Sequence, residues 1–267
     1  MVVTSEPEFN ECDLRDLRQA KARLEYPSLT AKLADLVGSP ISAMVRRLPK
    51  KWNEKVGEAT EIALFKGLEF SIRTMGQSDP RPSRDWLHKV VAVGSGAAGG
   101  AIGFYSLVVE LPFSTCVMLR SIADIARSEG HDISLMEVKL ACLEVFALGG
   151  KSSADDSAET GYWAVRGGLA KLVPQAIGYL AEGGPIRMGA SALDRFVAAI
   201  ASRFSVVITE EAAATAVPVV GAVSGGAINY LFMKHFQEMA RGHFVVKRLE
   251  EKYGSEAVEQ AYKDLVV

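Results

Sequence analysis

The sequence predicts an all-α protein, a multi-helix bundle in which two glycine-rich apolar helices pack in the core. Long segments carry apolar side chains at helical spacing and are bounded by capping residues, glycine or proline. Alternating apolar and polar runs, which half-buried strands need, are almost absent, and the one β-branched run, residues 204–209, is short. Both observations favour helices throughout the chain.

The first helices are predicted from their caps and apolar periods. Pro40 stands at a favourable first position for a short helix. Residues 52–74 carry small and apolar side chains at helical spacing, and this helix stops at Gly76. After the polar segment 77–85, which we interpret as a linker, a long helix is expected to begin near Asp85.

The following helices are read in the same way. One runs from Pro112 to Glu129. Ser134 and Glu137 match a capping box, because each side chain can accept a bond from the other residue's backbone N–H, and its helix should run to the glycine pair 149–150.

The second half of the chain continues the helical pattern. A helix is expected over residues 157–173, two or three more over 191–253, and a last short one after Ser255.

Composition and charge exclude several classes of protein. Apolar residues make up 49% and charged residues 23%, which is typical of a packed globular protein. A net charge of −2 and an isoelectric point near 6.1 argue against nucleic-acid binding, which needs a strongly basic face. Three scattered cysteines suit neither a disulfide framework nor a zinc site, so we expect a reducing compartment, no metal and no cofactor. The N-terminus has no readable secretory signal, and a cytoplasmic location follows as the expectation.

Two uncharged stretches, residues 90–109 and 212–233, exceed the ~18 residues that make a membrane-spanning candidate. Both are rich in glycine and alanine rather than leucine and phenylalanine, so buried core helices are favoured over membrane spans. The sequence Gly-Gly-Ala-Ile occurs once in each stretch, at 99–102 and at 225–228.

The glycines of these stretches are predicted to lie where helices pack closely, because small residues four apart let two backbones approach. They are Gly96, Gly99, Gly100, Gly103, Gly221, Gly225 and Gly226. Residues 94–99 also match the GxGxxG pattern of dinucleotide-binding proteins. That pattern needs an acid about twenty residues further on, whereas Glu110 follows Gly99 by eleven residues, and no βαβ unit surrounds it.

Polar residues beside the apolar stretches are the candidate ligand-binding residues: Glu110, Glu211, Asn229 and His235. If the two glycine-rich helices pack together, Glu110 converges with Glu211 or with Asn229, and Glu211 and Asn229 share a face of one helix. Such a polar spot at the end of an apolar groove suits an amphiphile. A second pair, Glu159 with Arg166, is expected to be a structural ion pair.

Three segments of the sequence form a recognisable set: residues 94–126, 159–170 and 210–254. They include Glu110-Leu111-Pro112 after the glycine-rich helix and Gly242-His243-Phe244 near the C-terminus. In these segments the chain resembles the EcsC family. The resemblance covers roughly residues 52–262, so we divide the chain into a helical extension over residues 1–51 and an EcsC-like domain over 52–267. The resemblance implies a bacterial helical protein without agreed catalytic residues, whose namesake is encoded beside an ABC transporter linked to secretion and membrane physiology.

Two functional hypotheses follow. The first is a peripheral membrane protein on the inner face of the cytoplasmic membrane, which binds a lipid or a membrane partner such as a transporter or secretion component. The mean hydropathy of +0.13 and the basic run at 46–51 support it. The alternative is a hydrolase acting on a lipid-like or peptide substrate in a helix-lined pocket, with the acids and His235 as its polar groups. Oligomeric state cannot be read from the sequence.

Overall fold

The computed structural model describes residues 9–25, 29–38, 40–46, 48, 51–75, 105–149, 161–189, 191–215 and 221–266. Every regular element in these ranges is a helix, so the predicted all-α class is confirmed. The helices are α1 (Glu11–Glu25), α2 (Leu29–Val37), α3 (Ile41–Val45), α4 (Trp52–Thr74), α6 (Tyr105–Ser128), α7 (Met136–Leu148), α8 (Gly161–Leu169), α9 (Leu172–Ala181), α10 (Ala192–Thr215), α11 (Gly221–Tyr253) and α12 (Ser255–Asp264). No described helix is both long enough and apolar enough to span a bilayer.

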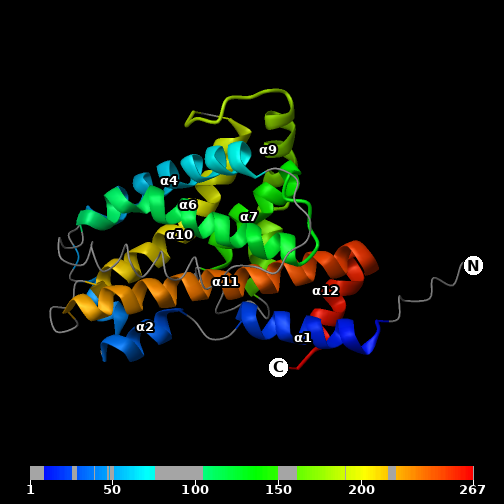
Figure 1. The fold of residues 1–267 in the computed structure, drawn as a ribbon, viewed down its shortest axis with the longest axis horizontal. Helices are drawn as coiled ribbons and strands as arrows, with labels where there is room; N and C mark the ends of the chain where they lie inside the picture. Colours follow the sequence, from blue (N-terminus) through cyan, green and yellow to red (C-terminus); the bar gives the residue numbers. More distant parts are fainter. Residues whose placement is uncertain are drawn as a thin grey trace, which may run out of the picture.

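The long helix α11 runs through the middle of the bundle (Figure 1). On one side it contacts α6, α7 and α10, and on the other it contacts α1 and α2, which follow one another along its length. The helix α4 packs on α6 and α10, and α12 folds back beside α1 and α11. The helices therefore form two layers, and α11 packs against both.

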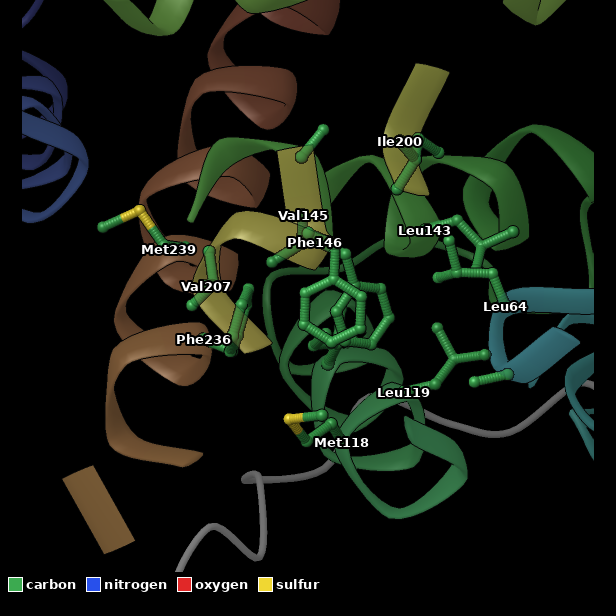
Figure 2. Packing of buried hydrophobic residues seen from close by; sticks show 14 of the residues in the cluster. Leu64, Met118, Leu119, Leu143, Val145, Phe146, Ile200, Val207, Phe236 and Met239 are labelled. Atoms are coloured by element: carbon green, nitrogen blue, oxygen red, sulfur yellow. The ribbon is translucent and has the colours of Figure 1, made fainter. Parts of the chain in front are cut away.

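The main core is built around aromatic rings from three helices. The ring centroid of Phe146 on α7 lies 4.6 Å from that of Phe204 on α10 and 5.4 Å from that of Phe236 on α11. Phe232 continues this row, 5.1 Å from Phe236. Figure 2 shows Phe146 within the cluster, surrounded by aliphatic side chains from the neighbouring helices. Such aromatic contacts add to the gain from burial alone.

The C-terminal end of α7 is closed by side chains from α10 and α11. The carbonyl of Ala147 accepts a bond of 2.9 Å from Arg203 Nε, and the carbonyl of Gly149 lies 3.0 Å from His235 Nε2. These bonds satisfy carbonyls that have no partner inside the helix. A Cβ on Gly149 would lie 2.5 Å from Cε1 of Phe236, so this close approach requires glycine.

A second, smaller core lies between α1, α8, α11 and α12. The Lys21 ammonium group donates to the carbonyl oxygens of Tyr262 (2.8 Å) and Leu265 (2.7 Å), where a cation offsets the negative end of α12. Where α1 crosses α11, a Cβ on Gly242 would lie 2.6 Å from Leu24 Cγ. The helix α1 is thus packed tightly on α11.

Several predicted helix boundaries need correction. The helix expected to begin at Pro112 begins at Tyr105 and continues through the proline, which costs one backbone hydrogen bond inside the helix. The capping box at Ser134 does not form: the N-cap of α7 is Leu135, and the Ser134 backbone N–H donates to Asp132 Oδ1 instead. The helix over residues 52–74 is confirmed.

The second uncharged stretch, residues 212–233, is not one helix. Its first residues end α10 at Thr215, and residues 221–233 begin α11. Glu211 and Asn229 therefore lie on different helices, and the expectation that they share a face of one helix is wrong. Of the first stretch, residues 90–104 lie outside the described residues.

Candidate functional site

Glu110 and Glu211, two of the predicted ligand-binding residues, lie close to each other in the structure. Glu110 is half-buried on α6, and Glu211 is buried on α10, with 4% of its surface exposed. Their carboxylates interact electrostatically. Helix packing thus joins two acids that are about a hundred residues apart in the sequence.

The packing register explains how they meet. Gln237 Nε2 on α11 donates to Ser121 Oγ on α6 over 2.8 Å, and eleven residues earlier on each helix stand Gly226 and Glu110. These two helices run in the same direction, because Glu129, near the end of α6, lies 3.5 Å from Arg248 further along α11.

The contact between α10 and α11 places Glu211 at the same level along α11 as Glu110. The ring of Phe204 on α10 packs between those of Phe232 and Phe236 on α11. These two helices are antiparallel, so Glu211, two turns beyond Phe204, falls opposite the region of Asn229. Both acids thus reach the first turns of α11.

The environment of Glu211 keeps a proton on its side chain. Burial raises the pKa of Glu211, the negative charge of Glu110 raises it further, and the result is about 8. At neutral pH the pair holds one proton that an isolated glutamate would release. A protonated carboxyl group carries one O–H donor besides its acceptor oxygens.

His235 lies apart from the acid pair. Its Nε2 must donate to the Gly149 carbonyl, since a carbonyl oxygen only accepts, and burial lowers the pKa of His235 to about 4. Arg203, which binds the same end of α7, precedes Glu211 by eight residues, roughly 12 Å along α10 at 1.5 Å per residue. The imidazole is neutral, and its Nε2 is occupied by a structural bond.

Asn229 is half-buried near the start of α11, at the level of the acids. Gly226 is buried one turn before it. Gly221 and Gly225 also lie in α11, whereas Gly96, Gly99, Gly100 and Gly103 lie outside the described residues. The helix-packing role of these glycines stays a prediction.

Arg166 forms a two-pronged ion pair with Glu250. Its two terminal nitrogens lie 2.7 and 2.9 Å from the two carboxylate oxygens, linking α8 to α11. The guanidinium group also lies over the ring of Trp163, 4.8 Å from the centroid. Glu159, the partner predicted from the sequence, lies outside the described residues, so the predicted pair stays untested.

A second polar cluster, which sequence reasoning missed, is enclosed beside this ion pair. His243 is completely buried, and its Nδ1 lies 3.1 Å from the Tyr162 hydroxyl. Its Nε2 lies 3.5 Å from Glu144 Oε2. The three residues come from α7, α8 and α11, and Tyr162 and His243 both lie in segments that carry the family resemblance.

The charges of this cluster follow from burial and hydrogen bonding. Burial lowers the pKa of His243 to about 4, against the opposing effect of Glu144. Burial alone would raise the pKa of Glu144, but the bond to His243 and the charges of Lys247 and Arg166 lower it. A neutral histidine thus connects an ionised glutamate to a tyrosine whose pKa is raised by burial. This line of polar contacts joins three helices across the bundle.

Within the part of the chain that the structure describes, no three His, Cys, Asp or Glu side chains are placed to hold a metal ion.

Comparison with known protein families decides the identity. The EcsC protein family matches residues 11–249 of the 267. The chain belongs to the EcsC family. The match includes the acid pair, the His243 cluster and α1 to α3, which precede residue 52. The division at residue 52 itself stays a prediction. No curated protein and no solved structure is detectably similar to the chain.

Proposed function

We propose that this EcsC protein is a peripheral membrane protein, on the inner face of a bacterial cytoplasmic membrane, that binds a lipid-like amphiphile. Its ligand carries an amine or ammonium head group, which lies against Glu110 and Glu211. The same location would bring it beside a transporter or secretion component, the partner that the family resemblance implies.

The observation that carries this proposal is the convergence of a buried glutamic acid with a half-exposed glutamate. Burial and the charge of Glu110 raise the pKa of Glu211 to about 8, so its carboxyl group is mostly protonated at neutral pH. A cationic head group suits this arrangement, because its positive charge neutralises that of the carboxylates, and an amine also donates hydrogen bonds to their oxygens. A cation also relieves the repulsion between the two acids.

The residues that follow each acid in the sequence are apolar. Leu111 is buried beside Glu110 in the sequence, and Ala212, Ala213 and Ala214 are buried after Glu211. Phe113, three residues beyond Glu110 on α6, has 59% of its surface exposed. Phe113 thus offers exposed apolar surface to an alkyl chain about one turn from Glu110.

Calorimetric titration with decyltrimethylammonium below its micelle concentration tests this proposal. We expect saturable binding at one site, at least tenfold weaker in Glu211→Gln. Glu210→Gln is the matched control, because Glu210 is the next residue on α10 and bonds to Thr30 (2.8 Å) rather than to Glu110. The affinity of Glu210→Gln for decyltrimethylammonium should stay within twofold of the wild-type value. The affinity of both variants for decanoate should also stay within twofold of the wild-type value.

Equal affinities of wild type and Glu211→Gln would refute the assignment of the site. Absence of saturable binding by the wild-type protein would refute the proposed ligand class.

A further inference from the structure

The helices α1 and α2 continue one register along α11. Asp13 Oδ2 lies 2.6 Å from Lys252 Nζ, and further along the same pair of helices Arg23 Nε lies 3.1 Å from Glu238. Residue numbers rise along α1 while they fall along α11, as antiparallel packing requires. The interaction of Lys32 with Glu238 extends this register from α1 into α2 (Figure 1).

Four cations gather around one carboxylate on this edge. Glu238 Oε2 contacts Arg23, and its Oε1 lies 3.5 Å from Arg241 Nη1. Lys32 on α2 interacts electrostatically with Lys234 on α11 as well as with Glu238. These five residues, which we name the basic edge, have a local charge of +3, although the whole chain has −2.

The cations of the basic edge repel one another. Burial lowers the pKa of Lys32, and the charge of Lys234 lowers it further. The pKa of Arg241 is lowered by burial and then by Arg23. An anion at this edge would reduce the repulsion, so the edge favours a negatively charged partner.

Two exposed apolar side chains lie at the end of the basic edge. Leu36 follows Lys32 by one turn on α2, and Tyr230 precedes Lys234 by one turn on α11. The antiparallel register places Leu36 at the level of Tyr230. They are 39% and 37% exposed. Cations beside exposed leucine and tyrosine are the combination found on surfaces that rest in the membrane interface.

We propose that the basic edge, together with Leu36 and Tyr230, is the surface by which this protein docks on anionic phospholipids. The cations meet head-group phosphates, and the two apolar side chains enter the interface beside them. This inference rests on the proposed membrane location, but it concerns a surface separate from the Glu110–Glu211 site.

Vesicle sedimentation at 0.1 M salt tests the docking surface, with vesicles of phosphatidylglycerol and phosphatidylcholine compared with phosphatidylcholine alone. Each basic residue near an anionic surface strengthens binding about fivefold. The double variant Lys32→Gln/Lys234→Gln should therefore bind anionic vesicles about 25-fold more weakly. The matched control is Lys55→Gln/Lys66→Gln, which removes two exposed lysines from α4.

Four results would overturn the inference: wild type binding both kinds of vesicle equally, the basic-edge variant staying within twofold of wild type, the α4 variant losing as much binding as the basic-edge variant, or displacement by glycerol phosphate at matched ionic strength. The last result would assign the edge to a soluble phosphate compound. Decyltrimethylammonium titration of the same variants separates the two proposals, because the basic-edge variant should keep full affinity at the acid pair.

Discussion

Replacing Glu211 by glutamine should stabilise the protein, and more so as the pH rises. Burial and Glu110 raise the pKa of Glu211 from 4.5 to about 8 in the folded state. Between these values the unfolded chain has released the proton while the folded chain still holds it. The unfolded state binds fewer protons, so stability falls as pH rises through this window. Glu211→Gln keeps the shape of the protonated side chain and removes this dependence.

The size of the effect follows from the pKa difference. At 1.36 kcal/mol per pKa unit, the penalty of Glu211 is about 1 kcal/mol at pH 5 and about 3 kcal/mol at pH 7. It levels off near about 5 kcal/mol above pH 8, where the folded protein also ionises. Glu211→Gln should exceed the wild type in free energy of unfolding by these amounts.

Urea unfolding followed by circular dichroism at pH 5, 7 and 8.5 measures this difference. Glu137→Gln, on the exposed face of α7, is the control, because Glu137 does not belong to the acid pair. A stability difference between Glu211→Gln and wild type that stays constant from pH 5 to 8.5 would show that Glu211 does not hold a proton in the folded state. The reasoning about the acid pair would then be wrong.

Two further predictions concern packing and thiol reactivity. Gly149→Ala should lower the free energy of unfolding by about 1–3 kcal/mol, because the new methyl group would lie 2.5 Å from the buried ring of Phe236. Thermal unfolding measures this loss, and Gly167→Ala is the control, because a methyl group there meets open space. Equal losses of stability in the two variants would contradict the prediction. In the native protein iodoacetamide should label the exposed Cys12 first and leave Cys142 unmodified, because Cys142 is buried and burial raises the pKa of its thiol. Mass spectrometry of the labelled peptides reports the order of labelling. Early labelling of Cys142 would contradict its burial.

Apolar spacing and capping residues predicted a helix correctly where one helical period continues up to a clear helix-ending residue. The helix Trp52–Thr74 lies within the range predicted from its apolar spacing and the following glycine. Local signals failed where tertiary packing overrides them. Pro112 continues inside α6 because the rest of that helix packs on α4 and α11, which offsets one missing backbone bond.

The uncharged stretch 212–233 shows a different limit. It lacks charge throughout, so hydropathy treats it as one unit, yet α10 ends at Thr215 and α11 begins at Gly221. The sequence predicted that Glu110 would converge with Glu211 or with Asn229 if the two uncharged stretches packed together as two helices. Glu110 and Glu211 do interact, but they lie on α6 and α10, so that condition does not explain their interaction. Only the packing of α6 and α10 against α11 brings them to the same level.

The buried cluster of Glu144, Tyr162 and His243 could not be found from the sequence. Its members are spread over about a hundred residues and lie on three helices, with no spacing that relates them. His243 stands in a run of apolar residues on α11, where a histidine with a buried partner looks like any core position. Only the packing of α7 and α8 against α11 brings these side chains together.

The most direct test of the central claim is a carbon-13 NMR titration of the Glu211 carboxyl carbon, with and without decyltrimethylammonium. The free protein should show a pKa of about 8 at this site. A bound ammonium head group favours the ionised carboxylate, so the pKa should fall when the amphiphile is present. An elevated pKa that is unchanged by the amphiphile would contradict the assignment of Glu110 and Glu211 as its head-group site.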